Sequence, residues 1–224
     1  MSHSSNFYPL SGQETVMKKR LNFIQRLASV AVAVGAVVAP ALVTAQAREE
    51  TLIVVEYYVK SLDAYFITGR ANEQQILDRT GDISRTGVTF QAISAVNANP
   101  DLTRICRFYV NRTSPFVSSH FYGRQGKDCE LILAVEPPGF SYEGLDFAVQ
   151  PLTPDQNSAG VITEKCPAGF SAVRRSFRPL TTSTGKTSNH RYTMSEATSA
   201  RAAEAGYVSE GIQFCVNFFT DVRP

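Results

Sequence analysis

Two histidines and two glutamates are the residues best suited to chemistry in this chain. His120 and His190 stand in similar motifs, and Glu143 and Glu210 each precede a glycine in another shared motif. An imidazole can bind a metal or transfer a proton near neutral pH, and two carboxylates about 5 to 9.5 Å apart can hydrolyse a glycoside. Because each type recurs at an equivalent position, a repeated structural contact is the favoured interpretation of both pairs.

Complete catalytic or metal-binding motifs are missing from the sequence. It contains neither an HExxH motif nor a calcium-binding loop, and its four cysteines lack the spacing of zinc ligands. We therefore expect no metal and no cofactor.

An internal repeat appears three times, over about residues 53–94, 104–150 and 170–217. The hydrophobic pattern of each copy predicts a strand, a hairpin loop, a second strand, a short helix and a third strand. One copy of this length cannot bury enough surface to fold alone, so we expect the three to share one core.

The third predicted strand of each copy contains a glycine: Gly87, Gly144 or Gly211. The alternation of apolar residues changes parity at this glycine, which indicates one extra residue in the strand. We therefore predict a β-bulge at each glycine and a structural role for the neighbouring Glu143 and Glu210.

These motifs resemble a bacterial secreted repeat family of unknown function, whose repeats read FY, then HFYT or HRYT, a helix and EGxxF. The matching segments are Ser119–Tyr122, Asn189–Thr193, Glu143–Gly144 and Glu210–Gly211. Such repeats are often appended to exported hydrolases and surface proteins. Because the function of the family is unknown, the resemblance implies a repeat architecture and no activity. The first copy departs from the pattern, with Ala64 where His is expected and Thr86 where Glu is expected.

We expect one domain over residues 48–224, preceded by an N-terminal extension and signal peptide over residues 1–47. Its expected fold class is β-rich α+β, with three ββαβ repeats closed around a pseudo-threefold axis in a propeller-like assembly with short helices. The signal peptide, about residues 17–47, has a basic start, an apolar run of about a dozen residues and the cleavage motif Ala45-Gln46-Ala47. We therefore expect a secreted or periplasmic protein without a permanent membrane anchor.

Charge and cysteine content agree with export. The formal net charge is +2, but residues 48–224 carry 18 basic and 19 acidic residues, so nucleic acid is not an expected partner. An even number of cysteines predicts two disulfides in an oxidising compartment. Three pairings are possible, and we favour the one that closes a loop within a copy, which joins Cys106 to Cys129 and Cys166 to Cys215.

The predicted hairpin loop lengthens from the first copy to the third, and loops on a rigid scaffold commonly carry binding residues. We therefore expect a monomeric, non-catalytic binding module for a cell-surface glycan or protein. The alternative is a small exported hydrolase that uses His120 or His190. The candidate binding residues are His120, Tyr122, Arg178, Lys186, His190, Arg191 and Tyr192.

Overall fold

The computed structural model describes residues 49–113, 116–156, 160–180, 188–217 and 219–221, all within one compact unit. The expected signal peptide and Lys186 lie outside the described residues. Within these ranges no helix combines the length and the apolar character that crossing a membrane requires.

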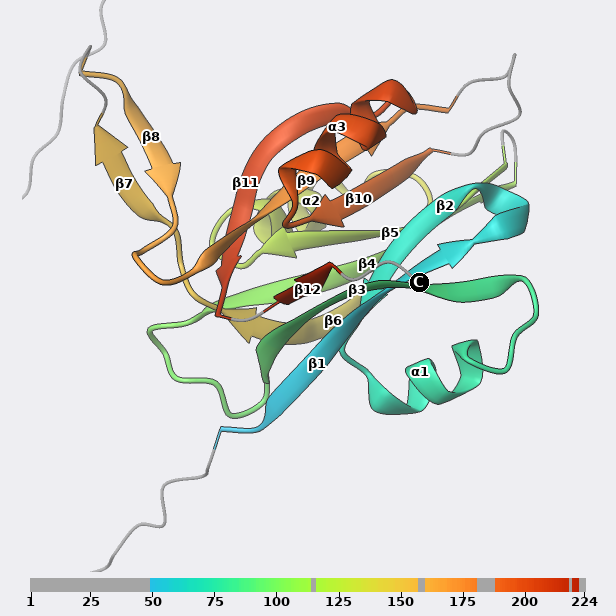
Figure 1. Ribbon diagram of the computed structural model, residues 1–224, viewed down its shortest axis with the longest axis horizontal. Helices are drawn as coiled ribbons and strands as arrows, with labels where there is room; N and C mark the ends of the chain where they lie inside the picture. Colours follow the sequence, from blue (N-terminus) through green and yellow to red (C-terminus); the bar gives the residue numbers. More distant parts are fainter. Residues whose placement is uncertain (1–48, 114–115, 157–159, 181–187, 218, 222–224) are drawn as a thin grey trace, which may run out of the picture. The chain divides into compact units, whose positions relative to one another are not determined.

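Most strands belong to one large antiparallel sheet with the order β2-β1-β3-β6-β4-β5, to which β12 adds by pairing with β3 (Figure 1). Strand β1 lies between β2 and β3, and β4 lies between β5 and β6, so each group of three has its first strand in the middle. The strands are β1 (Thr51–Val59), β2 (Ala64–Thr68), β3 (Ile83–Ser94), β4 (Thr103–Thr113), β5 (Phe116–Arg124), β6 (Phe140–Val149) and β12 (Phe219–Asp221).

Two smaller sheets complete the described strands. The sheet β10-β9-β11 again has its first strand in the middle, while β7 and β8 form a hairpin. Among the described residues, the backbone link between β11 and the segment directly after β6 is an isolated bridge between Gln150 and Cys215. The strands are β7 (Thr153–Gln156), β8 (Ile162–Lys165), β9 (Ser171–Arg178), β10 (Asn189–Thr193) and β11 (Val208–Val216).

The helices are short and contribute little to the core. They are η1 (Lys60–Leu62), α1 (Ala71–Leu77), α2 (Asp128–Val135) and α3 (Glu196–Glu204). Helix α1 has no buried residue, α2 buries Cys129, and α3 buries Thr198 and Ala202. Helices this short need packing for stability, and α3 also has an N-cap, since the Ser195 hydroxyl accepts a hydrogen bond from Thr198 N.

The predicted fold class is therefore wrong. This is an all-β fold, and the described residues form no closed propeller. The first reason is that the helices form no layer. The second is that β3 pairs with β6 through Ile93–Ala148 and Ser94–Phe147, which merges the first two groups of strands into one sheet.

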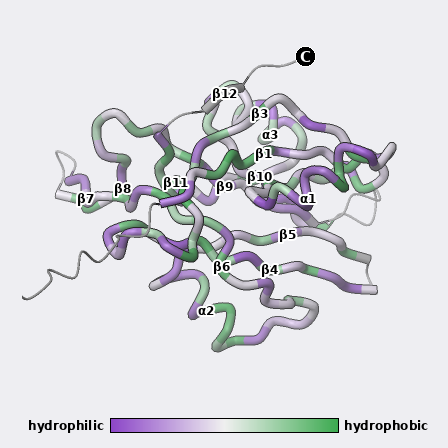
Figure 2. Tube along the Cα trace, turned by 90° about the horizontal axis from the view of Figure 1, so that it is seen from below, coloured by the Kyte–Doolittle hydropathy of each residue, from purple (hydrophilic) through white to green (hydrophobic). Residues whose placement is uncertain are grey.

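Aromatic side chains form the centre of the molecule. The rings of Phe90, Phe147 and Phe214 contact one another with centroid distances of 5.8 to 6.1 Å, and all three are almost fully buried. Figure 2 shows hydrophobic and hydrophilic residues alternating along the trace, as expected for strands with one buried face. Contacts between such rings add to the free energy gained by burial.

Side chains, and not backbone ladders, join strands β2, β5 and β10. The Tyr192 hydroxyl accepts a hydrogen bond from Tyr122 N and donates one to Tyr122 O, both 2.8 Å long. The Tyr122 hydroxyl donates to Ile67 O. The Asn189 amide accepts from Tyr65 N (3.0 Å) and donates to Tyr65 O (2.8 Å). Polar backbone groups at these strand edges are thus satisfied without a neighbouring strand.

Two disulfides are present, Cys106–Cys129 and Cys166–Cys215, and no described cysteine is free. The favoured pairing is confirmed. The first bond ties β4 to the start of α2, and the second ties the segment before β9 to β11.

Candidate functional site

Strand register identifies one position that is shared by β2, β5 and β10. His120 pairs with Tyr109, His190 pairs with Phe177, and Tyr65 pairs with Tyr58. In each case the partner lies near the end of the middle strand of its group. The register therefore places Tyr65, and not Ala64, at the position that the histidines occupy in the other two groups.

His120 belongs to a buried ion cluster centred on Arg107 of β4. The Arg107 guanidinium donates to both carboxylate oxygens of Glu73, at 2.6 and 2.7 Å. Arg107 Nε lies 2.7 Å from Glu143 Oε2, an ionic contact without hydrogen-bond geometry. The Arg107 side chain is only 2% exposed, so these carboxylates compensate a charge that is almost fully desolvated.

Arg107 also fixes the chemical state of His120. Burial, and then the charge of Arg107, lowers the pKa of His120 to about 3, so the ring is neutral near pH 7. Arg107 Nη2 lies 2.9 Å from His120 Nε2, and because arginine can only donate, Nε2 is the acceptor and Nδ1 carries the proton. The lone pair that a base or a metal ligand would use is therefore occupied.

His190 has a parallel set of neighbours in the second cluster. Arg175 of β9 donates from Nε to Glu210 Oε2 at 2.8 Å, and its Nη2 lies 3.8 Å from Asp128 Oδ1. His190 Nε2 lies 3.7 Å from Glu210 Oε2, which is too far for a hydrogen bond. The imidazole packs against two rings, those of Phe121 (5.1 Å between centroids) and Phe177 (4.7 Å).

The two histidines differ in their hydrogen bonds. Burial, followed by the charge of Arg175, lowers the pKa of His190 to about 3, so this ring is also neutral. In contrast to His120, His190 makes no ring hydrogen bond within the described part of the chain. Its donor and its acceptor are thus unused by the described residues.

The third position has different chemistry. Tyr65 stands in place of histidine, Glu56 in place of the buried arginine, and Thr86 in place of the glutamate before the glycine. Arg191 of β10 donates to both oxygens of Glu56, at 3.0 and 3.2 Å, and its guanidinium lies 3.7 Å from the centre of the Tyr65 ring. This arrangement is an ion pair with a cation–π contact and leaves no imidazole for chemistry.

Positive-φ glycines set the positions of the two glutamates. Gly144 has φ = 97° and Gly211 has φ = 80°, a region that side chains other than glycine rarely adopt. The pairing register shifts beside both, in β4–β6 and in β9–β11. These irregularities have the features of β-bulges and fit the expected change of parity; Gly87 (φ = 87°) likewise accompanies a shift in β1–β3.

A pocket of about 380 Å³ opens beside His190 and Glu210. Its apolar wall includes Phe140 and Phe177, and Ser119 contributes a hydroxyl. A smaller pocket of about 250 Å³ lies beside His120 and also includes Glu73. Only the larger pocket has a volume in the range usual for small-molecule sites.

Arg112 supplies a cationic group to the larger pocket. Its Nε donates to Pro138 O at 2.9 Å, and its stem runs close to Gly139 (φ = 87°), where a Cβ would lie 2.8 Å from Arg112 Cγ. Neither terminal nitrogen of Arg112 bonds to a described group. The backbone therefore orients this guanidinium while its terminal donors remain open.

Comparison with protein families places the whole site in one matched region. The family model described as Domain of unknown function (DUF5648) matches residues 53–217. The chain belongs to this family. The matched range contains both histidine clusters and the His190 pocket. The comparison with curated proteins finds no match, and neither does the comparison with solved structures.

Several residues expected at a binding rim of this DUF5648 domain lie in its interior. Tyr122 and Tyr192 are each 1% exposed and belong to the core. Arg178 is 2% exposed and pairs with Asp63 at 2.9 Å, and Arg191 pairs with Glu56. Of the seven candidates, His190 alone lines the larger pocket, His120 lines the smaller one, and Lys186 is not among the described residues.

Sequence analysis missed the cations that organise the site. Arg107 and Arg175 stand at matching places in β4 and β9, two residues before the aromatic end of the strand pattern, and this recurrence was the available signal. Glu73 and Arg112 have no counterpart in the motifs, so no sequence signal marked them. No group of three or more described acidic, cysteine or histidine residues could hold a metal ion.

Proposed function

We propose that this protein is an exported, non-catalytic binding domain that holds its ligand in the His190 pocket. The carrying observation is the state of His190: a neutral ring without a hydrogen bond, beside aromatic walls and an ionic Arg175–Glu210 pair. A pocket that combines apolar rings with a few fixed polar groups is typical of ligand sites.

Binding is favoured over catalysis by the same groups. A pKa of about 3 makes His190 a weak base at pH 7, whereas general bases work best with a pKa near the working pH. Glu210 is engaged by Arg175 at 2.8 Å, so it is not a free carboxylate that could replace the histidine. The residues are therefore better suited to orienting a ligand than to moving its protons.

The uncompensated charge in the described pocket lining indicates the class of ligand. The carboxylate of Glu210 is paired, His190 is neutral, and the terminal nitrogens of Arg112 are open. A guanidinium fork matches a carboxylate in two parallel hydrogen bonds. We favour a cell-surface glycan that carries an acidic sugar, with its ring against Phe140 or Phe177 and its carboxylate at Arg112.

A compartment outside the cytoplasm fits both the two disulfides and the signal peptide expected over about residues 17–47. The domain would then meet glycans outside the cytoplasm.

A glycan array with paired acidic and neutral saccharides tests the proposal on protein collected after export. We expect acidic saccharides to bind, with affinity reduced about tenfold or more in Arg112→Gln, since a hydrogen bond to a charged group contributes about 1.5–3 kcal/mol. Arg79→Gln, at an exposed arginine outside the pocket, is the matched control and should leave binding unchanged. Binding that ignores Arg112→Gln would contradict the assigned pocket.

The same preparation should be assayed with esterase and glycosidase substrates. We expect no turnover. Turnover that disappears in His190→Ala, while the folded state is retained, would overturn the non-catalytic assignment.

A further inference from the structure

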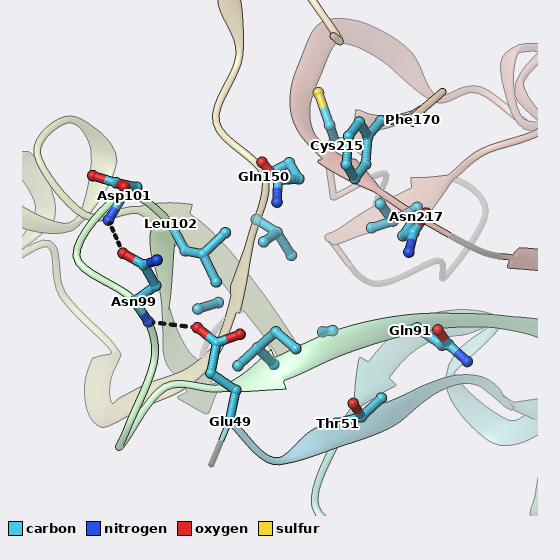
Figure 3. A pocket seen from close by; sticks show the side chains of 15 residues that line it. Glu49, Thr51, Gln91, Asn99, Asp101, Leu102, Gln150, Phe170, Cys215 and Asn217 are labelled. Atoms are coloured by element: carbon cyan, nitrogen blue, oxygen red, sulfur yellow. Dashed lines mark hydrogen bonds between the residues drawn. The ribbon is translucent and has the colours of Figure 1, made fainter. Parts of the chain in front are cut away.

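A second and larger cavity, of about 490 Å³, lies apart from the two histidine clusters. It is bordered by the start of β1 and the end of β3 on one sheet, by the chain around Gln150, and by the end of β11. Figure 3 shows Glu49, Asn99 and Asp101 on one side of this cavity and Asn217 on the other. None of its lining residues belongs to the His190 pocket.

Three side-chain amides at this cavity have no hydrogen bond in the described part of the structure. They belong to Gln91, Gln150 and Asn217, and they come from three different segments of the chain. Each amide offers two donor hydrogens and one acceptor oxygen. The apolar part of the lining includes Leu102, Val149 and the ring of Phe170. The cavity thus combines an apolar surface with several unused polar groups.

The walls of the cavity are held in place by their own contacts. Glu49 Oε1 accepts a hydrogen bond from Asn99 N at 2.9 Å, and Asn99 Oδ1 accepts one from Asp101 N at 3.0 Å (Figure 3). Gln150 and Cys215 exchange two backbone hydrogen bonds of 3.2 and 3.3 Å, and Cys215 is also fixed by its disulfide to Cys166. A preorganised wall loses little entropy when a ligand binds.

Charge distinguishes this cavity from the His190 pocket. Among the described residues, its lining contains the carboxylates of Glu49 and Asp101 and no lysine, arginine or histidine. A carboxylate ligand would be repelled here. Since carboxylates only accept hydrogen bonds and each amide also offers an acceptor, the lining favours a ligand rich in O–H donors.

We propose that this cavity is a second binding site, for a neutral saccharide of one or two sugar residues. Sugar hydroxyls, each a donor and an acceptor, match the amides and carboxylates of the lining, and the apolar face of a sugar ring matches Phe170. The ligand classes of the two pockets therefore differ in charge: neutral here and acidic at Arg112.

The test is a titration of the exported protein with neutral oligosaccharides of glucose, galactose, mannose and N-acetylglucosamine, followed by NMR and calorimetry. We expect at least one of them to bind with saturation and to shift the side-chain amide signals of Gln91 and Gln150. Gln150→Leu should weaken that binding tenfold or more. Gln75→Leu, on the exposed face of α1, is the matched control and should not affect it.

Three outcomes would overturn the proposal: no neutral saccharide binds, only cationic amines bind, or binding persists in the Gln91→Leu, Gln150→Leu double variant. If Gln150→Leu lowers the melting temperature, Asn217→Ser provides the second variant for the same measurement. Arg112→Gln separates the two sites, because it should weaken binding of acidic saccharides about tenfold or more and leave binding of neutral ones unchanged.

Discussion

His120 and His190 occupy the same register position, have the same lowered pKa of about 3 and lie beside matching arginine and glutamate residues. They differ in one hydrogen bond and one cavity. Arg107 donates to His120, and the space beside that ring is about 250 Å³; His190 lacks the bond, and its pocket is about 380 Å³. Similar arrangements around the two histidines therefore differ in whether the ring makes a hydrogen bond within the described residues.

Acidic residues outside the motifs cause this difference. Glu73, from α1, holds Arg107 with two hydrogen bonds and orients its guanidinium so that it also reaches His120. Arg175 has no such bidentate partner; Asp128 lies 3.8 Å away. Its Nη1 donates instead to the buried Tyr122 O, at 3.3 Å, and makes no hydrogen bond to His190.

Substitution of the arginines should produce the largest difference in stability between the two clusters. Arg107→Met leaves Glu73 and Glu143 without their buried counter-charge and should reduce the free energy of unfolding by about 3–5 kcal/mol. Arg175→Met should cost about half as much, because Arg175 makes one hydrogen bond to a carboxylate, that of Glu210, whereas Arg107 makes two to Glu73. Urea denaturation followed by circular dichroism measures both. Equal losses would show that the two clusters contribute equally to stability.

The disulfide Cys106–Cys129 fixes the start of α2. This helix carries Asp128, which belongs to the His190 cluster. Replacing both cysteines with serine should reduce the free energy of unfolding by about 3 kcal/mol. It should also broaden the NMR signals of the His190 ring more than those of His120. The double serine variant at Cys166 and Cys215 is the control; if it perturbs His190 equally, the link through α2 is wrong.

Acid should destabilise the protein through both imidazoles. The pKa of each is about 3 in the folded state and near 6.5 in the unfolded state, so the unfolded chain binds more protons between these values. The free energy of unfolding should therefore fall as the pH is lowered from 6.5 toward 3, by about 2 kcal/mol for each ring between pH 6.5 and 5.

Urea denaturation at a series of pH values gives this slope. His120→Leu and His190→Leu should each remove about half of the histidine contribution. The pKa of Glu73, about 2 because hydrogen bonds from Arg107 outweigh the effect of burial, adds a further loss only below about pH 4.5. A slope that neither histidine variant changes would mean that the rings are exposed to water.

At pH 7 the same two variants should change the free energy of unfolding differently. His120→Leu removes the acceptor of the Arg107 hydrogen bond and should cost about 1–2 kcal/mol. His190→Leu removes no hydrogen bond and relieves the burial of a polar ring, so stability should stay equal or rise slightly. Thermal unfolding at pH 7 measures both. A large loss in His190→Leu would reveal a structural role for that ring.

A small loss of stability should come from alanine at the glycines beside the two glutamates, and it should be the same in both. A Cβ at Gly144 or Gly211 would meet no atom within 4 Å, so only backbone strain opposes alanine. Gly144→Ala and Gly211→Ala should each cost about 1 kcal/mol. Unequal losses would show that the irregularities in β6 and β11 are not equivalent.

Sequence analysis found the local features and missed the long-range pairing. The parity change at Gly144, the short helix expected in each copy and the cysteine pairs depend on residues near one another in the chain or on simple spacing. The β3–β6 pairing depends on Ile93 and Ala148, which lie far apart in sequence and carry no motif. The propeller prediction failed there, since repetition specifies the unit but not how neighbouring units join.

The candidate site was predictable to a similar extent. The recurrence of His120 and His190 marked a shared register position, because register repeats with the motif. Burial of Tyr122, Tyr192 and Arg191 could not be inferred, since their motifs do not show which face of the strand meets another sheet. Arg112 needed the turn at Gly139 to bring it to the pocket, a contact that no pattern in the sequence encodes.

The double hydrogen bond of the Tyr192 hydroxyl has a consequence for the edge of strand β5. It occupies both backbone groups of Tyr122, a residue that is only 1% exposed. In Tyr192→Phe the ring remains, yet a donor and an acceptor of the backbone lose their partner in the interior. A single oxygen atom thereby makes this strand edge compatible with burial.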